Sequence, residues 1–152
     1  MGNKIPFPQA DDFEKVIKLI NLENVEKYND KIALSMILGD IADRQVQYYL
    51  SACMYLGILD EKKNLTSKGV SIRKLNYAGQ VVELSRIIVS DEIFGEVYFM
   101  QKYLEVKLTR EDVIGIMKKK ISFNSEELYK RRAQTVIKWI EWINNVMNDK
   151  NV

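Results

Sequence analysis

The chain has 152 residues and a mass of 17.8 kDa, enough for one domain or two very small ones that bury a core without disulfides or metals. Hydrophobic residues make up 47% and charged residues 29%, with only seven Gly and two Pro, which excludes disorder and predicts a helical protein. The single cysteine, Cys53, and the absence of histidine exclude internal disulfides, the usual zinc sites and histidine-based catalytic triads.

Neither a run of 18 apolar residues nor a basic-then-apolar leader occurs, so we expect no membrane contact and a cytoplasmic location. The net charge of +2 is too close to neutral to mark the whole chain as a nucleic-acid binder. The segment from Lys107 to Lys138, however, contains nine basic residues and only four acidic ones. Such a local excess suits a phosphate backbone, and the alternative is an ordinary solvated surface.

The first half of the chain carries the spacing of short amphipathic helices. Apolar residues three and four positions apart predict a first helix: Phe13, Val16, Ile17 and Ile20. Asp11 or Asp12 can cap it. A second short helix is expected from Lys31 to Leu38, with Gly39 at its end. Its candidate core contacts are Ile32, Ala33, Met36 and Ile37.

A third helix follows a tight turn at 40–43, where Asp40 is expected to cap the helix. Its apolar stripe consists of Val46, Tyr49, Leu50, Cys53 and Leu56, which leaves Arg44, Gln45, Gln47, Tyr48 and Ser51 outside. Ile58 and Leu59 then predict a short strand, 60–64 a polar turn and Leu65 the return strand, before Thr66 opens a helix. This order is typical of a winged helix-turn-helix domain, and we expect residues 1–76 to form one.

The second half is predicted to be helical throughout. A helix from Ala78 is interrupted at Ser90 and Asp91, and a further helix covers Glu92 to Tyr103. Thr109 and Asp112 resemble a capping box, 121–124 forms a turn, and Ser125 caps a last helix that reaches about Met147. The predicted fold is therefore mainly α, with two tandem winged helix-turn-helix-like units and one small β-hairpin wing. The second unit, which is helical, spans residues 77–152.

Seven residues of the third helix can be laid over seven of the last helix at an offset of 87 positions. Arg44 then coincides with Arg131 and Gln47 with Gln134. Arg binds guanine bidentately and Gln binds adenine bidentately in the major groove, the groove that admits a helix. Amphipathic helices share apolar spacing by default, so only these two polar coincidences carry information.

Two strings go beyond generic periodicity: RQVQYYLSACMYLG at 44–57, with LTSKG after it, and RRAQTVIKWIEWI at 131–143. Together they resemble the paired winged-helix DNA-recognition region of bacterial type II restriction endonucleases and related restriction-modification proteins. The resemblance covers about 12–147 and implies target recognition. In that family cleavage belongs to a separate nuclease domain that holds magnesium, and the sequence shows no such domain. We therefore expect no catalytic activity, cofactor, metal site or small-molecule substrate. The expected partners are double-stranded DNA and a nuclease domain or a second copy.

Carried over to this sequence, the resemblance assigns base readout to the two recognition helices and phosphate contacts to nearby lysines. The expected base-reading residues are Arg44, Gln45, Gln47, Tyr48, Arg131, Arg132, Gln134 and Thr135. The expected phosphate-binding residues are Lys62, Lys63, Lys118, Lys119, Lys120, Lys130 and Lys138.

Other interpretations compete with this one. Asp91, Glu105 and Lys107 imitate the acidic spacing of a magnesium-dependent nuclease, but the segment between them has helical spacing. Tyr48, Tyr49 and Tyr55 offer stacking surfaces for unpaired bases, against packing in the core. The chain could also be a transcriptional regulator that binds a palindromic site as a homodimer. A last alternative is a protein-interaction module in which Arg and Gln are merely solvated.

Overall fold

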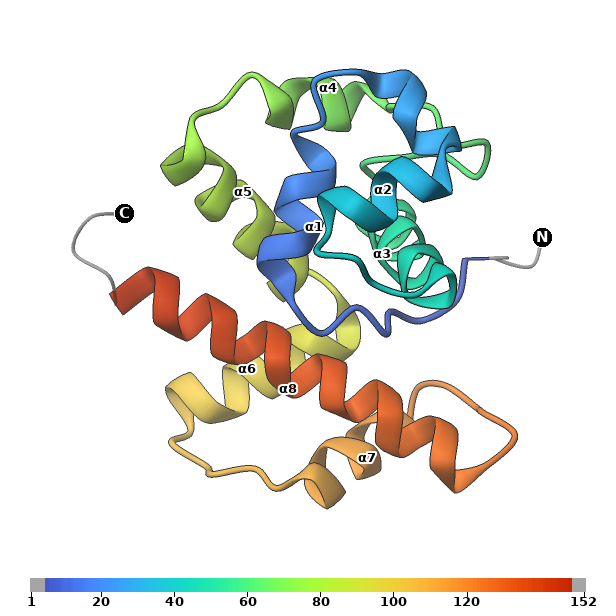
Figure 1. Ribbon diagram of the computed structural model, residues 1–152. Coiled ribbons are helices and arrows are strands. Elements are labelled where there is room, and N and C mark those ends of the chain that lie inside the picture. The colour runs from blue at the N-terminus through green and yellow to red at the C-terminus, as the bar shows by residue number, and fades with distance from the viewer. Residues whose placement is uncertain (1–4, 149–152) are drawn as a thin grey trace. The chain divides into compact units, whose positions relative to one another are not determined.

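The computed structural model describes residues 5–148, and this part of the chain is mainly helical, as predicted (Figure 1). The chain divides into two compact units, 1–76 and 77–152. The first contains α1 (Phe13–Ile20), the 3-10 helix η1 (Val25–Asn29), α2 (Lys31–Ile37), α3 (Asp43–Tyr55) and α4 (Ser67–Arg73). The second contains α5 (Tyr77–Val89), α6 (Glu92–Tyr103), α7 (Arg110–Lys118) and α8 (Glu126–Asn148). No helix within 5–148 is long and apolar enough to cross a membrane.

Helix α1 is the buried centre of the first unit and packs against α3. Asp12, not Asp11, caps it by accepting a hydrogen bond from the Glu14 N–H at 3.1 Å. The four apolar residues predicted for its inner face are all buried. Two side chains from later in the sequence bind the carbonyls at its end, because the Tyr28 hydroxyl donates to Leu19 O at 2.5 Å and Arg73 Nη1 donates to Ile20 O at 2.6 Å. Burial raises the pKa of Tyr28 to about 12.

Helix α2 faces the core with a different side than predicted. Ile32 and Met36 are 78% and 67% exposed, whereas Leu34 and Leu38 are fully buried. A helix of seven residues makes only two turns, so Leu34 and Leu38, four positions apart, define an inner face as well as the predicted set does. The predicted core contacts at Ile32 and Met36 are therefore wrong.

Helix α3 buries its predicted stripe, since Val46, Leu50 and Cys53 have no exposed surface. Two details differ from prediction. Ser51 was expected outside but is buried. Asp40 does not cap the helix, because it adopts a left-handed conformation with φ 58° in the preceding turn and α3 begins after Ala42, which makes no side-chain cap.

The predicted hairpin wing is reduced to one isolated antiparallel bridge between Leu59 and Leu65, and no strand forms within 5–148. The Cys53 carbonyl explains this difference. It accepts hydrogen bonds from the N–H groups of Ile58 at 2.9 Å and Leu59 at 3.3 Å, so these donors are unavailable to a ladder. Thr66 then caps α4 immediately after Leu65, which leaves no residues for a second strand.

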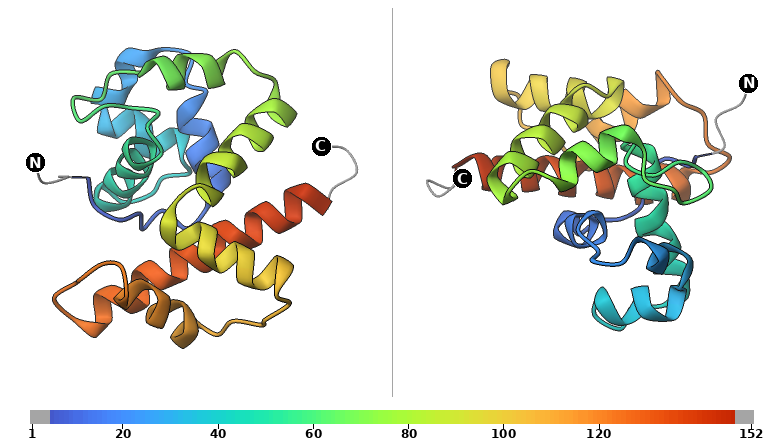
Figure 2. Two further views of the ribbon diagram at one scale, coloured as in Figure 1. Left: turned by 180° about the vertical axis from the view of Figure 1, so that it is seen from behind. Right: turned by 90° about the horizontal axis from the view of Figure 1, so that it is seen from above.

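In the second unit α8 is the longest helix, drawn in orange and red in Figures 1 and 2, and both α6 and α7 pack against it. Phe94 of α6 stacks on Trp139 of α8 with ring centroids 5.0 Å apart. The predicted capping box of Thr109 and Asp112 is present at the start of α7. Ser125 Oγ accepts a hydrogen bond from the Leu128 N–H at 3.3 Å, as a capping residue for α8 should.

Gly69 and Gly115 offer a matched test of packing. A Cβ at Gly69 would overlap the Ile58 carbonyl oxygen, whereas a Cβ at Gly115 in α7 would meet nothing within 4 Å. We expect Gly69→Ala to lower the free energy of unfolding by about 1–3 kcal/mol through overpacking. Gly115→Ala should raise it by up to about 1 kcal/mol through helix propensity. Urea unfolding of both variants measures this, and a neutral Gly69→Ala would contradict the close approach.

Cys53 should be inert in the folded protein. Burial leaves its thiol without exposed surface and raises its pKa from 9.0 to about 12. Because the thiolate is the reactive form, we expect labelling by a thiol reagent at pH 8 to be slower by roughly a thousandfold than in the urea-unfolded chain. Timed labelling followed by mass spectrometry measures this. Rapid labelling of the folded protein would show that α3 opens far more easily than its packing implies.

Candidate nucleic-acid interface

Helices α2 and α3 are joined by a tight turn at Gly39 and Asp40. Their φ angles are 95° and 58°, in the left-handed region that Gly adopts without strain and Asp tolerates. The Asp40 N–H donates to Ser35 O at 2.8 Å, and Ser35 Oγ donates to Ile41 O at 2.5 Å. These bonds close the end of α2 and set the direction in which α3 begins.

The first turn of α3 presents Arg44 and Gln45 to solvent. Arg44 Nε donates a hydrogen bond to the Tyr48 hydroxyl at 3.0 Å. That bond uses the Nε group, and a guanidinium can still bind a bidentate acceptor through its two Nη groups. Tyr48 is half-buried, and its hydroxyl holds the Arg44 guanidinium.

Gln47 is placed differently from Arg44 and Gln45. It is half-buried, and its Nε2 donates to Ser51 Oγ at 3.2 Å along the same helix. Of the four predicted base-reading residues of α3, Arg44 and Gln45 are exposed, whereas Gln47 and Tyr48 are half-buried.

Lys62 and Lys63 lie on a compact loop between α3 and α4. The Asp60 carboxylate closes this loop by accepting hydrogen bonds from the N–H groups of Lys62 and Asn64, both at 2.9 Å. These bonds hold the pKa of Asp60 below its usual value, the Asn64 N–H having the largest effect. Lys62 is exposed, and Lys63 is half-buried with a positive φ of 67°.

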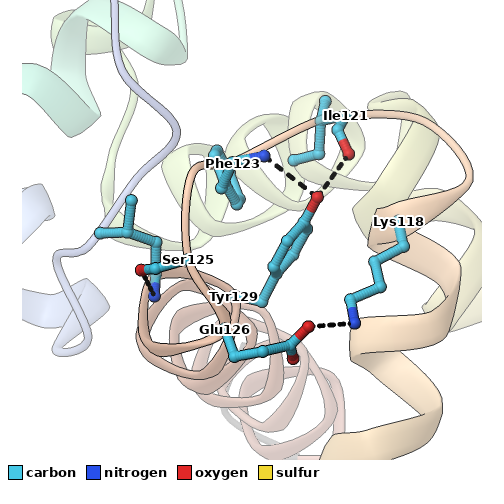
Figure 3. A network of polar contacts seen from close by, with 7 residues as sticks. Lys118, Ile121, Phe123, Ser125, Glu126 and Tyr129 are labelled. Atoms are coloured by element: carbon cyan, nitrogen blue, oxygen red, sulfur yellow. Dashed lines mark hydrogen bonds and ion pairs between the residues drawn. The ribbon is translucent and has the colours of Figure 1, made fainter.

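In the second unit Tyr129 anchors the turn between α7 and α8 (Figure 3). Its hydroxyl accepts from the Phe123 N–H at 3.0 Å and donates to Ile121 O at 3.1 Å. Figure 3 shows the ring lying between the turn and Lys118 of α7, whose ammonium is 5.3 Å from the ring centroid. Lys118 also pairs with Glu126 in the first turn of α8.

The predicted phosphate-binding lysines 118–120 differ in their surroundings. Lys118 is engaged by Glu126 and Tyr129, and Lys120 pairs with Glu96 at 3.1 Å. Both ammonium groups therefore already have partners within the second unit, which makes them weaker candidates for phosphate than predicted. Lys119 is exposed, as are Lys130 and Lys138 on α8.

Two predicted base-reading residues of α8 do not fit that role. Thr135 has no exposed surface, so its side chain belongs to the core and the prediction for it is wrong. Arg132 lies over the Phe123 ring at 4.6 Å, with its Nε and Nη1 atoms buried. It therefore holds the turn and does not reach outward. Arg131 is exposed and Gln134 is half-buried.

The alignment between the two helices is displaced by one helical turn. Arg44 is the second residue of α3, whereas Arg131 is the sixth residue of α8. With a rise of 1.5 Å per residue, Arg131 lies about 6 Å further along its helix. The first turn of α8 instead presents Glu126 and Glu127, which repel a phosphate backbone.

Three residues of the competing interpretations have structural roles. Asp91 caps α6 by accepting from the N–H groups of Ile93 at 2.9 Å and Phe94 at 3.2 Å. Among residues 5–148 no three acidic or cysteine side chains gather where they could hold a metal ion. Tyr49 is buried and its hydroxyl accepts from the Asp12 N–H at 3.1 Å, while the Tyr55 ring packs on Phe7 at 5.6 Å.

Sequence reasoning missed Tyr129 and Phe123. Two aromatic residues that bracket a predicted turn, six positions apart, are the available signal. A tyrosine at the edge of an apolar stripe can bury its ring and still bind the backbone of a neighbouring turn. The turn then takes its shape from a side chain of the following helix.

We expect Tyr129→Phe to lower the free energy of unfolding by about 1–2 kcal/mol. The substitution keeps the ring but leaves the Phe123 N–H and the Ile121 carbonyl without their shared partner. Thermal or urea unfolding measures the loss. The matched control is Tyr98→Phe, since the Tyr98 hydroxyl makes no hydrogen bond within the described part of the chain. Equal stability of the two variants would contradict the anchoring role.

One of three comparisons with known proteins gave a match. A family model described as a domain of unknown function, DUF7226, matches residues 15–148. The searches of curated proteins and of solved structures each gave no match. The family match includes α3, the loop after it and the four helices of the second unit. The chain therefore belongs to the DUF7226 family.

Proposed function

We propose that the chain binds double-stranded DNA with modest sequence specificity, through insertion of α3 into the major groove. The observation that carries the proposal is the exposure of Arg44 and Gln45 in the first turn of α3, directly after the fixed turn at Gly39 and Asp40. In helix-turn-helix proteins the N-terminal residues of the second helix contact base edges. Arg44 and Gln45 are also residue types that read guanine and adenine.

The loop at 60–64 supports the same role. We propose that the first unit is a variant of the winged helix in which this loop, closed by Asp60, replaces a two-stranded wing. Lys62 and Lys63 then contact phosphates beside the groove that α3 enters. Such contacts position the protein without reading sequence.

The second unit has a supporting role in this proposal. Its acidic first turn makes α8 unsuitable for end-on insertion, whereas Lys130, Arg131 and Lys138 are exposed along its side. We assign these residues to phosphate contacts, with Gln134 beside them. Base readout belongs mainly to α3.

The biological setting that we propose is target recognition in restriction-modification. It rests on the resemblance of 44–57 and 131–143 to the DNA-recognition region of restriction endonucleases. In this setting the chain performs no chemistry and a nuclease domain is its partner. A transcriptional regulator is the alternative, because a helix-turn-helix serves both roles equally well.

The test is a titration against a randomised duplex pool at two salt concentrations, with and without magnesium, followed by sequencing of the bound DNA. We expect enrichment of a short motif, salt-dependent affinity and uncut DNA. An asymmetric motif bound by a monomer favours the recognition role, and an inverted repeat bound by a dimer favours the regulator. Absence of binding at low salt contradicts the proposal.

Substitutions separate readout from phosphate contact. Arg44→Ala should weaken binding to the enriched motif by about ten- to a hundredfold and flatten the preference at one position. Lys62→Ala should weaken binding to all sequences alike and reduce the salt slope by roughly one. Lys27→Ala, which removes an exposed charge from η1, is the matched control. Equal losses on every sequence after Arg44→Ala would exclude base readout by Arg44.

A further inference from the structure

The second unit has an exposed apolar surface at the end of α6. Phe99, Tyr103 and Leu104 are 51%, 66% and 56% exposed. The rings of Phe99 and Tyr103 contact each other with centroids 5.2 Å apart. Aromatic side chains gathered in solvent cost free energy in the isolated protein and are enriched where proteins bind one another.

Two hollows lined by residues of the second unit have volumes of about 470 and 360 Å³. Val106 and Leu108 line both of them. Ile137 and Ile140 of α8 line the larger hollow, while Met100 and Ile116 line the smaller. We call the two hollows together the Val106 groove. Apolar residues line both hollows. Two separate apolar hollows match a helix whose apolar side chains are spaced along one face.

Glu105, which lines the Val106 groove, has a strained backbone conformation. Glu105 has a positive φ of 53°, at a position after a helix where Gly is the usual residue. The next N–H, of Val106, donates to Met100 O at 3.1 Å and fixes the conformation. A non-glycine residue in this region is strained, and such strain concentrates at functional positions.

The charges around the groove define what binds there. Four carboxylates line it, and only two ammonium groups do. The acidic residues are Glu105, Glu111, Asp112 and Glu141, and the basic ones are Lys107 and Lys119. The rim thus carries a charge of −2 within a chain of net charge +2. This balance repels nucleic acid and attracts a cationic partner.

We propose that the Val106 groove binds a basic amphipathic helix of a partner protein, with its apolar side chains in the two hollows and its Lys or Arg residues against the four carboxylates. Helix-in-groove binding of this kind needs apolar anchors three, four or seven positions apart. The inference does not rest on DNA binding, and of the residues that line the groove only Lys119 was also predicted to contact phosphate.

The test uses the full chain and a synthetic helical peptide of about 14 residues, with Leu at positions i, i+3, i+4 and i+7 and Lys elsewhere. Fluorescence anisotropy should show binding that weakens as salt is raised. A scrambled peptide of the same composition and a peptide with Glu in place of Lys should bind at least tenfold more weakly. Failure of the Lys peptide to bind, or equal binding of the Glu peptide, overturns the proposal.

Variants of the chain locate the binding. Val106→Lys places a positive charge between the two hollows at a side chain that is already 39% exposed, so we expect an unchanged melting temperature and at least tenfold weaker binding of the Lys peptide. Glu141→Lys should weaken binding roughly fivefold. Glu127→Lys is its matched control, with the same charge change on α8 outside the groove. Equal effects of the two Glu→Lys substitutions, or undiminished binding by Val106→Lys, overturn the assignment.

Glu105→Gly separates a binding role from a purely structural one. Glycine relieves the backbone strain, so the melting temperature should rise. Loss of a carboxylate from the rim should at the same time weaken binding of the Lys peptide by about threefold. A higher melting temperature with unchanged peptide affinity would show that Glu105 only ends α6, and would remove it from the site.

Discussion

The burial of one face of α3 is the constraint on which the first unit depends. Val46, Leu50 and Cys53 are fully enclosed, and Tyr49 ties the same face to the start of α1 through the Asp12 N–H. Rotation of the helix about its axis would expose these side chains and bury Arg44, whose charge is costly to desolvate. The outward direction of Arg44 and Gln45 is therefore a consequence of core packing, and any ligand of α3 meets a surface that the core has already fixed.

The helices were predictable because their signals are local. Caps at Asp12, Thr66 and Ser125 each act within three residues of their own position, and the stripe of α3 needs only its own spacing. The prediction of a two-stranded wing was wrong because a carbonyl at the end of α3 accepts hydrogen bonds from the N–H groups of Ile58 and Leu59. The prediction for the inner face of α2 was wrong because this short segment contains two apolar pairs four positions apart. Ile32 and Met36 form one pair, and Leu34 and Leu38 form the other, which is the buried pair. In both cases the deciding partner lies in another element.

The same distinction applies to the candidate site. Exposure of Arg44, Gln45 and Arg131 follows from amphipathic spacing and was predictable. The engagement of Arg132 by Phe123 and of Lys120 by Glu96 was not, because these partners lie on other turns and helices. The number of basic residues in a stretch of sequence does not show which of them pair with acidic or aromatic side chains in the folded chain. Folding reduces the apparent basic patch of 107–138 to a smaller set of outward charges.

The end of α1 has a consequence for the order in which the chain folds. Its last carbonyls receive hydrogen bonds from Tyr28 and from Arg73, the latter 53 residues further along the sequence. Closing so long a segment has an entropic cost that must be met before the contact stabilises anything. Helices as short as α1, with 8 residues, and α2, with 7, are marginal in water by themselves, so both depend on packing within the unit. The carbonyls at the end of α1 lack one of their two side-chain partners until residue 73 has been synthesised. The first unit therefore reaches its final packing only after Arg73 is in place.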